Sequence, residues 1–152
     1  MIYYTWSSFN RDCKLLVQQL KEAYFVSKDP VARSIFPQLK SITAIAVGGL
    51  CLGAKLRNLL NLPLIIISSS SYEGKKRKRR FTFSYLNQIT GPTLLVDEVV
   101  DSGRTMKKIK QYLQSLGVEV ITATLFCNKN SEFKPDFYCH ITTGWVIMPW
   151  ER

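Results

Sequence analysis

Acidic side chains are concentrated at one place in this sequence, between an apolar run and a turn. The run is Leu94-Leu95-Val96, the acids are Asp97, Glu98 and Asp101, and the turn is Ser102-Gly103-Arg104-Thr105. A turn that opens a helix presents backbone N–H groups, which suit a phosphate because unpaired donors and the helix dipole both favour an anion. Carboxylates accept hydrogen bonds from sugar hydroxyls and bind Mg²⁺. The stretch therefore predicts a sugar-phosphate site; a capped helix beside a solvated acidic pair is the alternative left open.

The length and composition favour one folded domain over residues 1–152. Hydrophobic residues make up 46% of the chain and charged residues 21%, as in a globular protein with a full-sized core. No window holds the roughly 18 consecutive apolar residues of a membrane helix, and the opening MIYYTWSSFN does not have the pattern of a secretory signal. The four cysteines form no CxxC pair, and His140 is the only histidine. We expect a cytoplasmic protein with free thiols and no structural zinc.

Much of the positive charge lies in one short run. The formal net charge is +10, and the run KKRKRR at residues 75–80 supplies six of the positive charges. Such a run has three possible interpretations: a solvated charge cluster, a nuclear localisation signal or a nucleic-acid patch. Aromatic residues do not alternate with the basic ones, as they would in a surface that binds single strands. Nucleic acid is therefore a conceivable partner but not the favoured one.

Hydrophobic periodicity predicts alternating strands and helices. The first helix is expected to be capped by Ser7 or Ser8. The expected strands are 42–47, 64–67, 93–96, 118–126 and 146–148, with a hairpin arm at 81–85 after a loop at 68–80. The expected apolar faces of three helices are Phe9, Cys13, Leu16, Leu20 and Tyr24; Leu52, Leu56 and Leu59; and Met106, Ile109, Leu113 and Leu116. In the third helix we expect Lys107, Lys108 and Lys110 to point outward and Gly117 to end the helix. This order predicts an α/β single domain with a mostly parallel twisted sheet flanked by helices.

The stretch from Leu94 to Thr105 resembles the phosphoribosyl-pyrophosphate (PRPP) signature of the type I phosphoribosyltransferases. Gly48-Gly49-Leu50 resembles the pyrophosphate loop of that family, and Ser71-Tyr72 resembles the pair in its mobile hood. KPDFY at 134–138 and WVIMPWE at 145–151 resemble the tail of the xanthine–guanine enzymes. The resemblance implies a hood loop at about 68–85, which would include the basic run, and a base-binding segment at about 126–152.

The resemblance also implies roles for the acidic stretch. Asp97 and Glu98 would bind the ribose hydroxyls and Mg²⁺, and Asp101 would contact the purine as a hydrogen-bonding partner or general base. Asp101 and the turn residues Ser102, Gly103, Arg104 and Thr105 would bind the 5-phosphate of PRPP. Asp101, Asp97 and Glu98 are thus the expected catalytic residues.

Further residues receive roles from the same resemblance. Val47, Gly48 and Gly49 would bind pyrophosphate; Ser71 and Tyr72 would belong to the hood; and Asn128, Lys129, Trp145 and Val146 would bind the base. The chain departs from the family pattern at two of these positions. Val47 stands where Arg or Lys is usual, and Asn128 stands where a lysine usually binds the 6-oxo group. Lys129 could replace that lysine. The amide of Asn128 can both donate and accept a hydrogen bond, so this residue alone does not decide between a 6-oxo and a 6-amino base.

The sequence therefore predicts a Mg²⁺-dependent enzyme that transfers ribose 5-phosphate from PRPP to guanine, xanthine or hypoxanthine in purine salvage. We expect PRPP and a purine base as its partners, together with a second copy of the chain in a dimer or tetramer. The alternative is a regulator of the same fold that binds nucleotides or nucleic acid with little catalysis.

Overall fold

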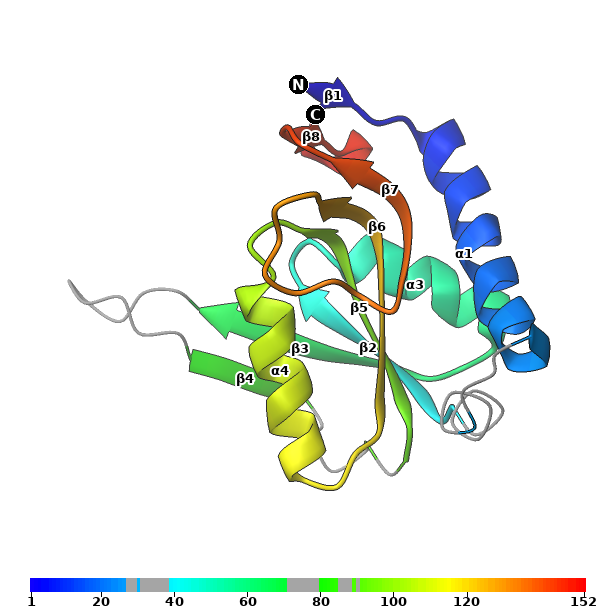
Figure 1. Ribbon diagram of the computed structural model, residues 1–152, viewed down its shortest axis with the longest axis vertical. Helices are drawn as coiled ribbons and strands as arrows, with labels where there is room; N and C mark the ends of the chain where they lie inside the picture. Colours follow the sequence, from blue (N-terminus) through cyan, green and yellow to red (C-terminus); the bar gives the residue numbers. More distant parts are fainter. Residues whose placement is uncertain (27–29, 31–38, 71–79, 85–88, 90) are drawn as a thin grey trace.

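A six-stranded sheet organises the computed structural model, which describes residues 1–26, 30, 39–70, 80–84, 89 and 91–152 (Figure 1). The strands are β1 Ile2–Tyr3, β2 Ser41–Ala46, β3 Leu64–Ser70, β4 Arg80–Ser84, β5 Thr93–Val100, β6 Val120–Asn128, β7 Phe137–Thr142 and β8 Val146–Ile147. The helices are α1 Trp6–Val26, α3 Leu50–Leu60, α4 Arg104–Ser115 and the short 3-10 helix η3 Pro149–Glu151. The predicted fold class is confirmed.

The order of the strands places a topological switch point beside the acidic stretch. The large sheet has the order β4-β3-β2-β5-β6-β7, and all neighbours are parallel except β3 and β4. The chain runs outward from β2 to β3 on one side and from β5 through β6 to β7 on the other. Sheets of this kind bind ligands at the carboxyl ends of the strands where the order reverses, so the loops after β2 and β5 are the expected site.

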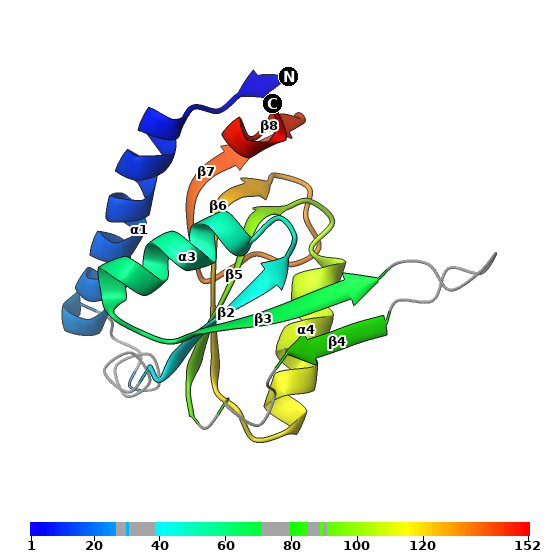
Figure 2. The same cartoon turned by 180° about the vertical axis from the view of Figure 1, so that it is seen from behind.

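Helices cover both faces of the sheet. In Figure 1, α4 lies on one face, and the reverse view of Figure 2 shows α1 and α3 on the other. Successive residues of β5 supply the two layers: Leu94 and Val96 pack in the α1 and α3 layer, and Leu95 packs in the α4 layer. This alternation follows from the two-residue period of a strand. None of the helices in the described ranges is long and apolar enough to cross a membrane.

Helix α1 begins earlier than the sequence predicted. The Thr5 Oγ1 atom accepts a hydrogen bond from the Ser8 backbone N–H at 3.1 Å, and the Thr5 carbonyl accepts the first helical bond, from Phe9 N, at 2.9 Å. Thr5 is therefore the N-cap, and the prediction of Ser7 or Ser8 was wrong. Within α1, Phe9, Cys13, Leu16 and Leu20 are buried, as predicted.

In the other two long helices, the predicted apolar faces are buried except at the helix ends. Leu52, Leu56, Met106, Ile109 and Leu113 are buried, whereas Leu59 and Leu116 are exposed because each lies at the last turn. Lys107 and Lys108 are exposed, but Lys110 is partly buried because its ammonium lies 3.6 Å from the Asp136 carboxylate. Gly117 has φ 78°, the left-handed conformation that ends a helix.

Two strands were not predicted, and two were predicted too short. β7 extends the sheet beside β6, and β1 pairs in parallel with β8 in a small separate sheet. β3 continues to Ser70, so part of the predicted loop at 68–80 is strand, and β4 is the predicted hairpin arm. β5 continues to Val100, so Asp97 and Glu98 lie within a strand instead of after it.

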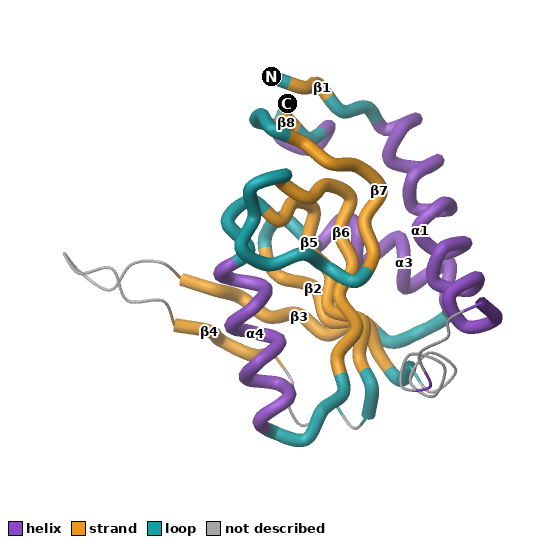
Figure 3. The backbone as a smooth tube through the Cα atoms, in the orientation of Figure 1, coloured by secondary structure: helices purple, strands orange, loops and turns teal. Residues whose placement is uncertain are grey.

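The β1–β8 pair brings the two ends of the chain together beyond the end of the main sheet (Figures 1 and 3). Ile2 N donates to Trp145 O at 2.9 Å and Tyr4 N donates to Ile147 O at 3.0 Å. The C-terminal Arg152 donates from Nη2 to Tyr4 O at 2.8 Å. The segment predicted to bind the base is thus held by the N-terminal segment.

Candidate active site

A cavity of about 350 Å³ opens at the carboxyl edge of the sheet, a volume within the range of small-molecule sites. Residues from β5, the loop after it, β6 and the chain between β7 and η3 form its walls. They are Glu98, Val99, Asp101, Asn128, Thr142, Thr143, Gly144, Trp145, Val146 and Glu151. The structure therefore brings Glu98 and Asp101 of the acidic stretch together with Asn128, Trp145 and Val146 of the predicted base-binding set.

The glycine loop after β2 packs directly on the acidic strand. A Cβ atom on Gly48 would lie 2.5 Å from the Glu98 carboxylate, and one on Gly49 would lie 2.7 Å from Val96 O. Gly49 therefore needs glycine because backbone atoms lie in the way, whereas a Cβ atom at Gly48 would displace the end of the Glu98 side chain. The Gly49 N–H already donates to Ile45 O at 2.8 Å, and the Val47 side chain is 80% exposed.

The two adjacent acids have raised pKa values. Burial and the neighbouring Glu98 raise the pKa of Asp97 to about 8, although the Glu98 backbone N–H donates to Asp97 Oδ1 at 2.8 Å and opposes the shift. Burial and the charge of Glu151 raise the pKa of Glu98 to about 7, and a hydrogen bond from Trp150 opposes this. The Glu98 Oε2 atom is buried and has no hydrogen-bond partner. This pair would gain from a cation or from hydroxyl donors.

The turn after β5 opens helix α4 in the way that the sequence predicted. Gly103 has φ 81°, the left-handed region that favours glycine, and it stands at the N-cap position with no side-chain cap. A Cβ atom there would lie 2.6 Å from Ser131 Oγ. Ser102 and Arg104 are exposed, and Thr105 is partly buried. The end of the helix thus faces solvent beside the acids, as an anion site requires.

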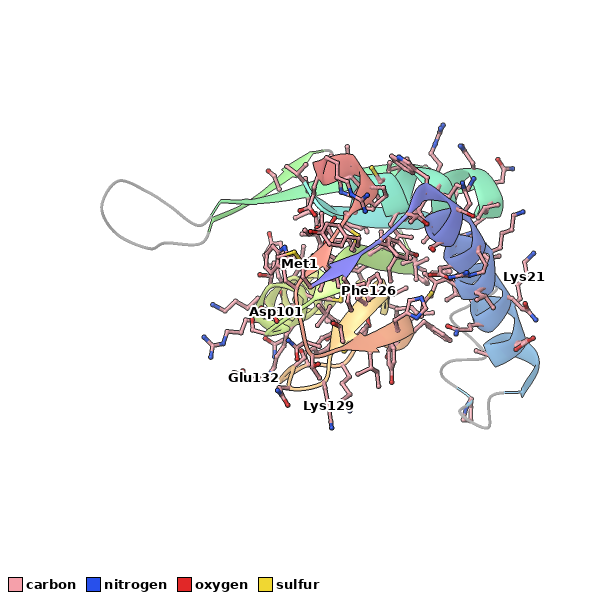
Figure 4. The ribbon with its side chains drawn as sticks, turned by 90° about the horizontal axis from the view of Figure 1, so that it is seen from above. Met1, Lys21, Asp101, Phe126, Lys129 and Glu132 are labelled. Carbon is pink, nitrogen blue, oxygen red and sulfur yellow. The ribbon has the colours of Figure 1, made fainter. Side chains whose placement is uncertain are left out.

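Asn128 is hydrogen-bonded to Asp101. Its Nδ2 donates to Asp101 Oδ1 at 2.7 Å, and its Oδ1 accepts from Asn130 N at 2.9 Å. These two bonds fix the orientation of the amide, because a flip would place oxygen against a carboxylate and NH₂ against an N–H. Lys129 is exposed, does not line the cavity and points away from the body of the protein in Figure 4.

Trp145 and Val146 line the cavity at the start of β8. Thr142 shapes the turn before them, since its Oγ1 donates to Gly144 O at 2.9 Å and accepts from Gly144 N at 3.1 Å. The carbonyls of Trp145 and Ile147 both accept from the N-terminal segment. Because successive carbonyls of a strand point to opposite sides, the Val146 carbonyl is directed away from β1. The Trp145 side chain is 66% exposed, as a stacking surface would be.

This arrangement matches a known family. The pattern described as the phosphoribosyl transferase domain covers residues 3–151. The chain belongs to the phosphoribosyltransferase family. The membership that the PRPP-like stretch predicted is confirmed, and the match also includes the N-terminal segment from residue 3.

Individual relatives agree with the family assignment. A xanthine-guanine phosphoribosyltransferase from Desulfotalea psychrophila is 27% identical, over 97% of this chain and 84% of that protein. The solved purine phosphoribosyltransferase from Pyrococcus horikoshii has a TM-score of 0.76 at 25% identity, over 99% of this chain and 93% of that one. The xanthine-guanine-hypoxanthine phosphoribosyltransferase of Helicobacter pylori has the same fold, with a TM-score of 0.81 at 21% identity and the same two coverages.

The donor set of this phosphoribosyltransferase fits a magnesium ion. No group of three or more His, Cys, Asp or Glu side chains that could hold a metal occurs in the described ranges. Mg²⁺ keeps several waters and is commonly bound by one or two carboxylates together with substrate phosphates. Asp97 and Glu98 supply such a pair, and the unpartnered Glu98 Oε2 is an available oxygen.

Glu151 is a cavity residue that sequence reasoning did not assign. It lines the cavity from η3, and its Oε2 accepts from Met148 N at 2.6 Å. The acidic residue that ends the WVIMPWE stretch was its only signal in the sequence. Ser71, Tyr72 and most of the basic run lie outside the described residues, so their predicted hood role stays a prediction.

Proposed function

We propose that this phosphoribosyltransferase transfers the ribose 5-phosphate of PRPP to a 6-oxopurine and releases pyrophosphate, with Mg²⁺ bound by Asp97 and Glu98. The observation that carries the proposal is the junction of two sites at one sheet edge. The open end of α4 and the acidic strand lie on one side, and a cavity walled by Asp101, Asn128 and Trp145 lies on the other. A ribose 5-phosphate would connect them.

The proposed reaction needs no side-chain nucleophile. Breaking the ribose C1–O bond builds positive charge on the sugar and negative charge on the pyrophosphate, and fixed charges stabilise both. The Asp97 and Glu98 carboxylates would bind the ribose hydroxyls, and the bound Mg²⁺ would stabilise charge on the leaving group. The α4 end would hold the 5-phosphate. Asp101 Oδ1 already accepts from Asn128, and its other oxygen would meet the base.

The orientation of Asn128 supports a 6-oxopurine over adenine. An amide nitrogen carries two N–H groups, and one of those on Asn128 donates to Asp101. The amide oxygen is engaged by Asn130 N, so the remaining N–H is the group that Asn128 can offer to a base. A 6-oxo group accepts such a bond, whereas a 6-amino group is itself a donor. Trp145 would stack on the base, and the Val146 carbonyl would accept from its amine.

The direct experiment measures pyrophosphate release from PRPP and Mg²⁺ with guanine, xanthine, hypoxanthine or adenine as the only base. We expect release with at least one 6-oxopurine and none with adenine. Release with adenine alone would contradict the role of Asn128. If no base gives pyrophosphate release but nucleotides bind tightly, the regulator is favoured instead. The cytoplasmic location, the salvage role and assembly as a dimer or tetramer stay predictions.

A further inference from the structure

The charged side chains that line the base cavity are all acidic. They are Glu98, Asp101 and Glu151, and the described lining residues include no Lys, Arg or His. By the resemblance to the family, Asn128 stands where a lysine usually meets the base, and it brings no charge. Lys129 does not replace it, since its side chain is exposed outside the cavity. The Met1 amino group lies near Gly144 but is not part of the lining.

The acids approach the cavity from different elements, so their charges do not depend on one flexible segment. Asp101 follows β5 and is fixed by the 2.7 Å bond from Asn128. Glu151 belongs to η3 and is fixed by the 2.6 Å bond from Met148 N. Glu98 lies in β5, and Mg²⁺ would offset its charge in the proposed reaction. Asp101 and Glu151 are both exposed in the protein without ligands, and they would disfavour an anionic base most once the bound base displaces water from between them.

We propose that this cavity selects neutral 6-oxopurines and discriminates against the xanthine anion, with Asn128 as the residue that determines the preference. The inference rests on the proposed function. Xanthine, with oxo groups at both C2 and C6, loses a proton near neutral pH, whereas guanine and hypoxanthine stay neutral there. A lysine ammonium at position 128 would compensate the negative charge of xanthine; the uncharged amide of Asn128 does not.

The test is the ratio of kcat/KM for xanthine to kcat/KM for guanine in the intact protein. When both bases react as neutral molecules, ionisation of the free enzyme and of PRPP affects both reactions alike and cancels in this ratio, so its pH dependence reports the ionisation of the base. We expect the ratio to fall about tenfold per pH unit above the pKa of xanthine, because only the neutral base would be used. The ratio of hypoxanthine to guanine should stay constant and serves as the internal control.

Matched variants locate the effect. Asn128→Lys should raise the xanthine-to-guanine ratio about tenfold or more above the pKa of xanthine, since it adds a cation inside the cavity. Asn130→Lys makes the same change two positions away, outside the lining, and should leave the ratio unchanged. Glu151→Gln removes a cavity charge while keeping an acceptor for Met148 N, and it should also raise the ratio. Glu119→Gln, at the opposite edge of the sheet, should not.

The outcomes separate this inference from the proposed function. If guanine and hypoxanthine are substrates and the xanthine ratio is constant with pH, the proposed function stands and the charge selection is wrong. Equal ratios for Asn128→Lys and Asn130→Lys would also overturn it. If no base is a substrate, the proposed function itself fails; binding of xanthine and guanine, measured by calorimetry over the same pH range, then tests the cavity alone. Xanthine affinity that does not fall with pH would overturn the inference.

Discussion

The side-chain amide of Asn128 connects the end of β6 to the loop after β5 through a 2.7 Å hydrogen bond from Nδ2 to Asp101 Oδ1. The bond joins the residue predicted to contact the 6-position of the base to the residue predicted to act on its ring nitrogen. Because Asn130 N donates to the other side of the same amide, Asn128 holds Asp101 in place, and its remaining N–H is the one that would meet the base in the proposed function. In the proposed function it would thus position Asp101 as well as bind the base.

Asn128→Ala should therefore raise the KM for the base about tenfold, since a hydrogen bond to a charged group is worth roughly 1.5–3 kcal/mol. The KM for PRPP should change little. Steady-state kinetics with guanine and with PRPP varied separately measure both constants. Asn130→Ala is the matched control, because only the backbone N–H of Asn130 takes part. Equal increases in the two KM values would show that Asn128 supports the fold and not the base.

The paired acids should make stability depend on pH in the protein without ligands. The pKa of Asp97 is raised from 3.8 to about 8 and that of Glu98 from 4.5 to about 7. For such groups the folded state holds more protons than the unfolded state, so their contribution is fully present below about pH 4 and is lost as pH rises through the folded values, to about pH 8. Urea unfolding over this range measures the loss.

The double variant Asp97→Asn, Glu98→Gln should remove most of that pH dependence and unfold at higher urea than the parent at pH 8. The same variant should bind PRPP with Mg²⁺ at least about tenfold more weakly, because the charge-assisted contacts are gone. Calorimetric titration measures the affinity. Unchanged PRPP affinity would exclude the acidic pair from the site, and an unchanged urea midpoint at pH 8 would show that folding does not raise the pKa values of the two carboxyls.

The sequence predicted the parts of this site that depend on short-range pattern. The run Leu94 to Thr105 specified its strand, turn and helix start locally, and the apolar faces of the helices follow from spacing alone. The extent of β5 could not be predicted in this way. It continues through the acids because Asp97 pairs with Thr124 and Val99 pairs with Phe126 in β6, and such long-range partners leave no signal in the strand itself.

The same limit explains the missed strands. β7 mixes polar and apolar residues and is stabilised by its parallel pairing with β6 and by its contact with α1, where His140 Nε2 lies 2.6 Å from Asp12 Oδ2. β1 has only two residues, and its partner lies at the other end of the chain. The predicted base-binding segment at about 126–152 included Glu151, but sequence reasoning assigned this residue no role of its own, and the structure places it in the cavity wall.

Trp145→Ala should raise the KM for the base about tenfold or more and leave the KM for PRPP nearly unchanged, because stacking on an aromatic ring is worth roughly 1–3 kcal/mol per base. The side chain is 66% exposed, so the variant should keep the melting temperature of the parent within a few degrees. Thermal unfolding and steady-state kinetics together make the test. A large loss of thermal stability would show that Trp145 supports the fold instead of binding the base.

Asp12→Asn should destabilise the fold by about 3 kcal/mol, as expected when one partner of a buried charged network is lost. The Asp12 carboxylate is fully buried and accepts from Tyr4 Oη at 2.6 Å and from Arg11 Nε at 3.0 Å, with His140 at 2.6 Å. Burial by itself would raise the pKa of Asp12, but these hydrogen bonds outweigh burial and lower it. Urea unfolding at neutral pH measures the loss.

The pH dependence of the Asp12 effect has a definite sign. Because the folded pKa is lowered, the stabilisation is present above the ordinary value of 3.8 and is lost as pH falls through the folded value. The difference in the free energy of unfolding between the parent and Asp12→Asn should therefore become smaller at acidic pH. Arg11→Gln removes the partner whose side chain is 63% exposed, and it should cost less than about 1 kcal/mol. Equal costs for the two variants would contradict the network.

Ile2→Pro should weaken base binding from a distance, because proline has no N–H to donate to Trp145 O. That bond orients the carbonyl of Trp145, directly before Val146, so we expect the KM for the base to rise several-fold while the KM for PRPP stays constant. Ile2→Ala is the matched control: it shortens the same side chain, which is 42% exposed, but keeps the N–H. If the two variants behave alike, the side chain matters and the backbone bond does not; if proline alone raises the base KM, the N-terminal strand positions the base-binding segment.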